Sequence, residues 1–272
     1  MAAPPVILSI AGYDPSSGAG VTADVKTAAA LGCYAVTCIT ALTVQSTQGV
    51  FRVEATAADL VSETLKALAD DVEIRAVRIG MLGSGEVAKA LVEFLSRRRL
   101  PNVVLDPVVR SSSGAALLDE AGMGVLRTRL IPLCDVITPN IGEAAMLAET
   151  DLLVPGQVNW DESLPDIRGI ATRIHDLGAR AVVITGGHLA APNDFLSYRR
   201  GEKTESEVFP GEPIESRSTH GTGCAFATSL ACRLALGDEL RAAVGAAKDY
   251  VRKAIRSAYP LGKGVGPVNH FG

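Results

Sequence analysis

A glycine-rich segment near the end of the sequence, residues 218–225, carries the clearest chemical signal. It reads Ser-Thr-His-Gly-Thr-Gly-Cys-Ala and leads into a run of small and apolar residues typical of a buried helix. Free backbone N–H groups at a helix N-terminus, beside flexible glycines, bind anions such as phosphate. We therefore predict an anion hole formed by Gly221, Thr222, Gly223 and Cys224.

Cys224 is the residue of this segment that could take part in a reaction. It would lie in the first turn of the helix, where the helix dipole is expected to lower the thiol pKa and favour the thiolate. The alternative is a structural cysteine in a tightly packed helix, since free cysteine is among the most buried residue types. The other cysteines are interpreted as structural residues of that kind: Cys33, Cys38, Cys134 and Cys232.

Oxygen-bearing side chains follow two segments that read as strands. Asn140 and Glu143 follow one strand, and Asp106 ends another. Amide and carboxylate oxygens suit a Mg²⁺ site that waters and phosphates complete. Asn140 and Glu143 also have the spacing of a helix N-cap and its capping-box partner, and both functions are compatible. Asp106, followed by proline, is interpreted either as a turn residue or as an acid that faces the site.

Gln45 ends an uncharged, apolar segment that reads as a buried strand. A buried amide must be hydrogen-bonded, and it offers an acceptor beside two donors. That pattern fits the edge of a heterocycle that presents a ring nitrogen and an amino group. The alternative is a side chain whose hydrogen bonds go to the backbone.

Residues 18–23, Gly-Ala-Gly-Val-Thr-Ala, match the glycine pattern of a dinucleotide-binding turn. That function requires an acidic residue about 20 positions later, and no charged residue occurs between Lys26 and Arg52. We therefore favour a loop that lets a compact substrate approach the backbone, with Asp24 in the first turn of the next helix. The sequence has no GxxxxGK[ST] phosphate loop and no GxSxG motif. Its 4 histidines lack the spacing of metal ligands.

Strands that alternate with helices must position these residues, which predicts a parallel sheet covered on both faces. Ligands of such sheets bind beyond the carboxyl ends of the strands. We expect one domain over residues 1–272 with an antiparallel edge hairpin. Strands are expected over 6–11, 35–44, 76–80, 102–108, 135–140 and 180–187, and the hairpin over 194–210. Helices are expected over 21–31, 86–98, 119–130, 141–149, 166–177, 222–236 and 239–257, and from an N-cap at Thr56 to 69; residues 151–165 read as a loop.

Composition argues against several classes of binding partner. The chain of 272 residues has a net charge of −4 and 4% aromatic residues, which disfavours nucleic acids and anionic membranes. Residues 27–51 carry no charge, but their changing periodicity indicates a helix end and a strand rather than a membrane span. An odd total of 5 cysteines without a CxxC pair is typical of a reduced, cytoplasmic protein.

Several longer segments resemble, in order, the hydroxymethylpyrimidine/phosphomethylpyrimidine kinases, a branch of the ribokinase-like superfamily. They are ILSIAGYDPSSGAGVTADVKTAAALGCYAVTCITALTVQST, VLDPVVRSSSG, DVITPNIGEAAML, VVITGGH, STHGTGCAFATSLA and GPVNHF. Together they extend over nearly the whole chain. Most sugar kinases of the superfamily are known for Asp, acting as a base, where this branch and this chain carry Cys224. The loop after Asp14, the charged Arg110 and the ending after Gly262 depart from the pattern of the branch.

The resemblance implies a three-layer αβα sandwich with a mostly parallel central sheet. It also implies ATP-dependent phosphorylation of 4-amino-5-hydroxymethyl-2-methylpyrimidine, and then of its monophosphate to the diphosphate, in thiamine biosynthesis. Cys224 would assist deprotonation of the hydroxymethyl group. A pyridoxine/pyridoxal kinase of the same fold is the nearest alternative, and an inactive regulator that binds a small molecule is the second.

The resemblance further implies a role for each part of the site. Gln45 would bind the aminopyrimidine in a pocket formed with Gly12, Asp24, Met81 and Asp106. Mg²⁺-ATP would be bound by Asn140, Glu143, Thr185, Gly187 and Lys248, with Glu143 holding Mg²⁺ through water. Homodimers are common among the resembling kinases, so we expect a homodimer.

Overall fold

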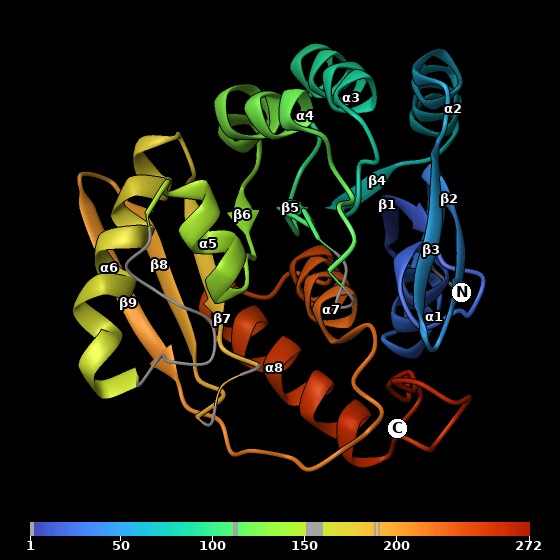
Figure 1. Cartoon of the computed structure of the whole chain (residues 1–272). Helices are drawn as coiled ribbons and strands as arrows, with labels where there is room; N and C mark the ends of the chain where they lie inside the picture. The colour runs from blue at the N-terminus through green and yellow to red at the C-terminus, as the bar shows by residue number, and fades with distance from the viewer. Residues whose placement is uncertain (1–2, 111–113, 151–159, 188, 190) are drawn as a thin grey trace.

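The computed structural model describes residues 3–110, 114–150, 160–187, 189 and 191–272. Its centre is a 9-stranded sheet with the order β3-β2-β1-β4-β5-β6-β7-β8-β9 (Figure 1). The strands from β2 to β7 in this order are mutually parallel, and β3, β8 and β9 each run antiparallel to a neighbour. The strands are β1 (Val6–Tyr13), β2 (Tyr34–Ser46), β3 (Gly49–Ala55), β4 (Ile74–Ile79), β5 (Val103–Leu105), β6 (Val136–Ile137), β7 (Ala181–Thr185), β8 (Asp194–Arg200) and β9 (Lys203–Phe209).

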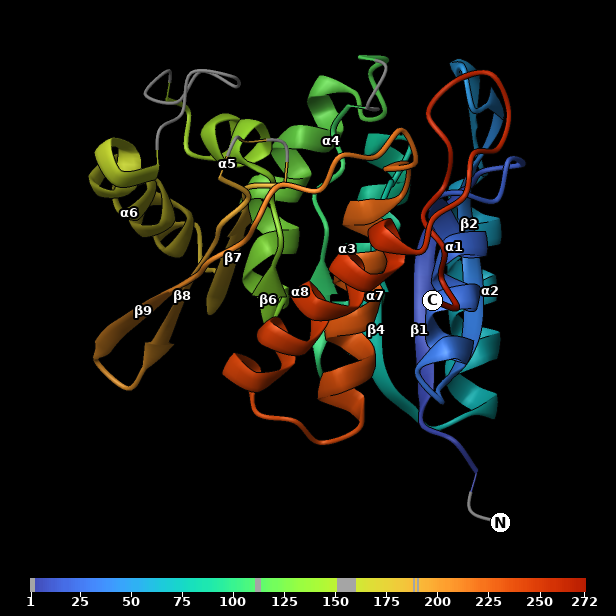
Figure 2. The ribbon, with the colours of Figure 1, turned by 90° about the horizontal axis from the view of Figure 1, so that it is seen from below.

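Helices cover both faces of this sheet (Figure 2). One face carries α1 (Gly20–Ala30), α7 (Thr222–Ala235) and α8 (Leu240–Arg256). The other carries α2 (Ala58–Asp71), α3 (Gly85–Arg97), α4 (Glu120–Val125), α5 (Ile141–Leu147) and α6 (Trp160–Asp176). The fold expected from the sequence, a mostly parallel αβα sandwich with an antiparallel edge hairpin, is confirmed.

The two cores follow from the alternation of side chains along each strand. In β5, Val103 and Leu105 enter the core beneath α2–α6, whereas Val104 enters the core beneath α1, α7 and α8. In β7, Val182 and Val183 divide between the two cores in the same way. Strands buried on both faces read as continuous apolar runs, which is why they could be predicted from the sequence.

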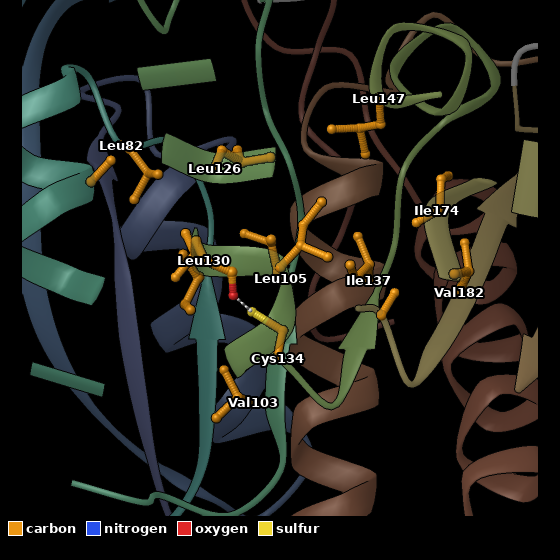
Figure 3. Close-up of a cluster of buried hydrophobic side chains, with 14 of the residues drawn as sticks. Leu82, Val103, Leu105, Leu126, Leu130, Cys134, Ile137, Leu147, Ile174 and Val182 are labelled. Carbon is orange, nitrogen blue, oxygen red and sulfur yellow. Dashed lines mark hydrogen bonds between the residues drawn. The ribbon is translucent and has the colours of Figure 1, made fainter. Parts of the chain in front are cut away.

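Figure 3 shows the core on the α2–α6 side, where Cys134 packs among Leu130, Leu105 and Val103. The Cys134 thiol donates a hydrogen bond to the Leu130 carbonyl oxygen at 3.2 Å. Burial raises the pKa of Cys134, and the nearby carboxylate of Asp135 adds to the effect. Cys134 is therefore an inert structural residue, as expected from the sequence.

Several element ends differ from the expectation by a few residues, and four differences are larger. The helix expected over 119–130 is divided into α4, a π-helical turn (Leu126–Leu130) and a 3₁₀ turn (Ile131–Leu133), where Pro132 lacks a backbone donor. Thr56 does not cap α2, which begins after Ala57. Strand β3 was not expected, because its residues are exposed or only half-buried and show no apolar alternation. Helix α6 begins at Trp160 and contains Pro165, so the expected loop ends earlier; its residues 151–159 lie outside the described part of the chain.

The uncharged stretch 27–51 forms the end of α1, all of β2 and the start of β3, as a helix end followed by strand. Across the described residues, no helix combines the length and the apolar character needed to cross a membrane.

Candidate active site

A cavity of about 620 Å³ lies at the carboxyl ends of the parallel strands. Because these ends meet at one edge of the sheet, residues far apart in the sequence line the same space. Every site residue predicted from the sequence lines this cavity except Asp24. They are Gly12, Gln45, Met81, Asp106, Asn140, Glu143, Thr185, Gly187, Gly221, Thr222, Gly223, Cys224 and Lys248.

The middle of the cavity is the N-terminus of α7. Gly221 is its N-cap, with a left-handed φ of 86°, and no side chain caps the helix. A Cβ at Gly221 would lie 1.8 Å from the Gly18 carbonyl oxygen, so the loop before α7 packs directly on the loop before α1. The first N–H groups of a helix have no intrahelical partner. With Thr222, Gly223 and Cys224 at the cavity wall, this terminus can bind an anion.

Cys224 has the position that the sequence predicts but not the predicted pKa. Burial raises its thiol pKa to about 11, the carboxylates of Asp24 and Asp106 raise it further, and Arg78 opposes them. The thiol is only partly exposed, toward the cavity. The expectation of a lowered pKa is wrong, because loss of water and two nearby carboxylates outweigh the helix dipole.

Arg78 and two carboxylates form a buried charged group beneath α7. Arg78 Nη2 lies 2.8 Å from Asp106 Oδ2, and Arg78 Nη1 lies 3.4 Å from Asp24 Oδ2.

Asp24 also accepts hydrogen bonds from Ser9 Oγ at 2.5 Å and Thr228 Oγ1 at 2.7 Å. All its visible partners are therefore protein groups. The expectation that Asp24 lines the substrate pocket needs correction: its side chain is 0% exposed, and α1 begins at Gly20, which places it in the second turn.

Asn140 and Glu143 form a capping box at the start of α5. The Glu143 N–H donates to Asn140 Oδ1 at 3.0 Å, and the Asn140 N–H donates to Glu143 Oε2 at 2.9 Å. Burial and the nearby Asp106 carboxylate raise the pKa of Glu143 to about 8. Burial likewise raises the pKa of Asp106 to about 6, although Arg78 lowers it. The cavity thus has two carboxyl groups of raised pKa, of which Asp106 is paired with Arg78.

Gln45 lies at the other end of the cavity, next to the carboxyl end of β1. Its side-chain oxygen is 3.1 Å from Thr43 Oγ1, and its nitrogen is 3.3 Å from His220 Nε2. Gly12 and Met81 lie nearby, and a Cβ at Gly12 would come within 2.9 Å of the Met81 sulfur. A planar ring can therefore meet one amide edge and an apolar thioether in this pocket.

The glycine-rich loop between β1 and α1 is organised by Asp14. Its carboxylate accepts hydrogen bonds from the backbone of Ser16, Gly18 and Ala19 and from His220 Nε2, the last at 2.8 Å. A Cβ at Gly18 would come within 2.3 Å of His220 Cδ2. Gly18 thus provides room for the His220 ring. The sequence had led us to expect that this glycine-rich loop provides room for a substrate instead.

Lys248 lies at the end of the cavity beside β7 and β8. Its Nζ donates to the Pro192 carbonyl oxygen at 2.7 Å and to Asp194 Oδ2 at 2.8 Å. Asp194 Oδ1 accepts from the Gly186 N–H at 3.1 Å. Lys248 therefore connects α8 to the β7–β8 connection, at the level of Thr185 and Gly187.

Three functional candidates were missed from the sequence. Arg78 is the one charged residue of the segment 76–80, which reads as a buried strand, and that anomaly was a usable signal. Asp14 was noted only as part of a loop. His220 was set aside because no second histidine has metal-ligand spacing from it, although it directly precedes the predicted anion hole.

At the carboxyl end of a parallel sheet, the cavity combines an uncapped, glycine-led helix N-terminus with carboxyl groups. This arrangement fits the small-molecule kinases of the ribokinase-like class that the sequence resembles. Comparisons with known proteins narrow this class. The sequence model of the family described as "Phosphomethylpyrimidine kinase" matches residues 14–269. This chain belongs to that phosphomethylpyrimidine kinase family, so it is a phosphotransferase, and the family implies ATP as the phosphoryl donor.

Two curated relatives support the assignment. The chain is 42% identical over 265 residues to the thiamine biosynthesis bifunctional protein ThiED of Geobacter sulfurreducens, covering 97% of this chain but 52% of that protein. It is 39% identical over 259 residues to the hydroxymethylpyrimidine/phosphomethylpyrimidine kinase of Aquifex aeolicus, covering 95% and 97%. The chain therefore spans about half of the bifunctional protein and nearly all of the second kinase.

Solved structures give the same fold. An ADP complex of Bacillus subtilis pyridoxal kinase superposes with a TM-score of 0.85 at 32% identity, covering 98% of each chain. The phosphomethylpyrimidine kinase of Clostridium difficile 630 gives a TM-score of 0.78 at 34% identity, covering 92% of this chain and 99% of that one. The family, fold and kinase class predicted from the sequence are confirmed.

Proposed function

We propose that this chain transfers a phosphoryl group from ATP to the hydroxymethyl group of 4-amino-5-hydroxymethyl-2-methylpyrimidine, and then phosphorylates the monophosphate. The observation that carries the proposal is the position of the α7 N-terminus. It lies in one cavity between the Gln45 pocket and the Asn140–Glu143 corner. A phosphoryl group bound there has the acceptor on one side and the nucleotide on the other, as in-line transfer requires.

At the acceptor end, Gln45 is the recognition residue. Its amide offers one acceptor and two donors, which can pair with the amino group and the adjacent ring nitrogen of the pyrimidine. Met81 and Gly12 line the same end of the cavity, and Met81 provides an apolar contact. Asp24 contributes indirectly, since it holds Arg78 and Thr228 behind the cavity wall.

At the nucleotide end, the binding residues are Asn140, Thr185, Gly187 and Lys248. Without a GxxxxGK[ST] loop, the chain must bind the phosphates elsewhere, and the N–H groups of Gly223 and Cys224 at the start of α7 are suited to this role. Lys248 acts by holding the β7–β8 connection in place through Asp194 and Pro192.

The same cavity fits a magnesium ion that arrives with the nucleotide. Among the described residues, no group of three or more His, Cys, Asp or Glu side chains is arranged to hold a metal. The Asp106 carboxylate raises the pKa of Glu143, and Mg²⁺ is commonly held by one or two carboxylates together with phosphates and waters. When bound, the ion would neutralise charge on the phosphate oxygens. Glu143 would hold it through water, since Oε2 accepts the Asn140 N–H.

Cys224 is proposed to assist removal of the acceptor proton. Its pKa of about 11 means that it is a thiol in the resting enzyme at neutral pH. In a loose phosphoryl-transfer transition state there is little covalent chemistry for the protein to perform before bond formation. Only the thiolate form of Cys224 can accept a proton, and Arg78 favours that form by lowering the thiol pKa. Cys224 therefore acts from its deprotonated fraction: the thiolate positions the hydroxyl group and receives its proton, becoming the thiol, as the new P–O bond forms. In the second step the acceptor is already an acid and needs no such help.

The experiment that tests this function is ADP release from Mg²⁺-ATP with hydroxymethylpyrimidine, with the products resolved by mass. We expect a monophosphate that converts to the diphosphate. Pyridoxal is assayed in parallel, because the solved pyridoxal kinase shares the fold. Phosphorylation of pyridoxal alone would replace the proposed substrate, and binding without ADP release would indicate an inactive regulator.

The homodimer expected from the resemblance remains a proposal. The edge strand β3 and its neighbour β2 expose Leu42, Val44 and Phe51, which are 53%, 57% and 67% exposed. An apolar sheet edge of this kind is suited to burial against a second copy. Light scattering on the eluting protein measures its mass, and a mass of one chain would contradict the proposal.

A further inference from the structure

His220 connects two parts of the site that the mechanism treats separately. Its Nε2 lies 2.8 Å from Asp14 Oδ2 and 3.3 Å from the side-chain nitrogen of Gln45. The ring lies against Gly18, where an added Cβ would come within 2.3 Å of His220 Cδ2. Its backbone is held too, since its N–H donates to the Gly266 carbonyl at 2.9 Å and its carbonyl accepts from the Val268 N–H at 3.2 Å.

The contact with Asp14 determines where the proton of His220 lies. Burial alone would raise the pKa of Asp14, but hydrogen bonds from His220 and Ser16 hold it below its ordinary value. Asp14 is therefore an ionised carboxylate, which only accepts hydrogen bonds. His220 Nε2 must then carry a proton, and this single N–H donates to Asp14 at 2.8 Å with the Gln45 amide beside it at 3.3 Å.

That proton selects one orientation of the Gln45 carboxamide. A half-turn of the amide exchanges its oxygen and nitrogen at the same positions. With the amide nitrogen toward His220, two hydrogen-bond donors face each other. The amide oxygen then needs a hydrogen bond from Thr43, whose only hydroxyl proton already donates to the Tyr13 carbonyl oxygen at 2.9 Å. With the oxygen toward His220, the imidazole N–H that donates to Asp14 has the Gln45 oxygen as a second acceptor. The amide nitrogen then donates to Thr43 Oγ1, and Thr43 donates to Tyr13, so that every group is paired.

We propose that His220, held by Asp14, is a positioning residue that fixes the order in which Gln45 presents its acceptor and its donor to the substrate ring. This inference rests on the proposed role of Gln45 in binding the pyrimidine. A 4-aminopyrimidine edge offers a donor on the amino group and an acceptor at the ring nitrogen. A 4-oxo pyrimidine offers the reverse order. An amide that cannot rotate pairs with the 4-amino edge and not with the 4-oxo edge, because a mismatched edge leaves buried polar groups without hydrogen bonds.

The test uses 4-amino-5-hydroxymethyl-2-methylpyrimidine and its 4-oxo analogue as two ligands of the same shape. Their dissociation constants are measured by calorimetry on the wild type and on His220→Phe, which keeps a ring against Gly18 but removes the N–H. We expect His220→Phe to bind the amino compound more weakly and the oxo compound more tightly, so that the ratio of the two constants changes about tenfold or more.

Two further variants separate this role from a general loss of structure. Thr43→Val removes the other partner of the amide and should change the same ratio in the same direction. His175→Phe removes a distant buried histidine that bonds Ser197 Oγ at 2.9 Å and the Ala179 carbonyl at 2.8 Å. It should lower the melting temperature without changing the ratio.

The outcomes also separate the inference from the function on which it rests. If Gln45→Ala leaves the affinity for the amino compound unchanged, the proposed role of Gln45 is wrong. If Gln45→Ala weakens binding while His220→Phe leaves the ratio unchanged, only the role of His220 is wrong. In the Gln45→Ala background, His220→Phe should have no further effect on the ratio, and a persisting effect would overturn the proposed coupling.

Discussion

Arg78 and Asp106 form an ion pair across neighbouring strands, with Nη2 and Oδ2 2.8 Å apart and the arginine side chain 0% exposed. Arg78 belongs to β4, and Asp106 directly follows β5, at the edge where the cavity opens. The guanidinium also faces Asp24 at 3.4 Å and lowers the pKa of Cys224. One buried cation thus pairs with two carboxylates and opposes the rise in the pKa of the Cys224 thiol.

Replacing Arg78 by methionine should destabilise the protein strongly. The change leaves Asp24 and Asp106 buried without their cation, and breaking a buried pair from one side costs about 3–5 kcal/mol. Urea unfolding followed by circular dichroism measures the loss. Arg75→Gln is the matched control, because Arg75 belongs to the same strand but forms an exposed pair with Glu73; its effect should stay below about 1 kcal/mol. Equal effects of the two changes would contradict the buried pair.

The raised pKa of Glu143, about 8, predicts that stability without nucleotide falls as pH rises. The folded state holds a proton that the unfolded state releases near pH 4.3. The contribution of Glu143 is therefore greatest below that pH and is lost as pH rises through 8, with a slope of up to about 1.4 kcal/mol per pH unit. Glu143→Gln should flatten this dependence. Urea unfolding at pH 5, 6, 7 and 8 measures both slopes, and parallel curves would show that the Glu143 pKa is not raised.

The positions of the site residues could be predicted because they follow from strand order. Gln45, Asp106 and Asn140 all stand where an apolar run ends, and parallel strands end at one edge. The chemical state of Cys224 could not be predicted, because it depends on burial and on charges from distant segments: Asp24 and Asp106 raise the thiol pKa, and Arg78 lowers it. The local sequence indicates only the helix dipole, which predicts a lowered thiol pKa where the structure gives a raised one.

The same limit explains the other differences. Asp24 is an acid in a glycine-rich neighbourhood, and the sequence does not show that Ser9, Thr228 and Arg78 surround it. Strand β3 forms because it pairs with β2 at an exposed edge, and such strands lack the alternation that marks a buried face. His220 gains its role only where two loops, more than two hundred residues apart in sequence, are packed together.

Two neighbouring glycines should respond differently to alanine. Gly221→Ala forces a side chain into a backbone with φ 86° and brings its Cβ to 1.8 Å from the Gly18 oxygen. It should lower stability by about 1–3 kcal/mol and reduce activity. Gly223→Ala meets nothing nearer than Asp106 Oδ2 at 3.9 Å, so its stability should change by less than about 0.5 kcal/mol while kcat falls through crowding of the anion hole. Thermal unfolding and steady-state rates of both variants measure this. Full activity of Gly223→Ala would place the phosphoryl group elsewhere.

Cys224→Ala should damage the first phosphorylation more than the second. The hydroxymethyl group must lose a proton when it is phosphorylated, and removal of a positioned general base typically costs about 10²–10⁴-fold. The phosphate acceptor of the second step is already ionised, so its rate should fall only a few fold. Separate assays that begin from the hydroxymethylpyrimidine and from its monophosphate measure the two steps. Because the pKa of Cys224 is about 11, its alkylation by iodoacetamide should be slow at pH 7 and rise about tenfold per pH unit. Equal losses in both steps would assign Cys224 to holding the phosphoryl group instead of removing the acceptor proton.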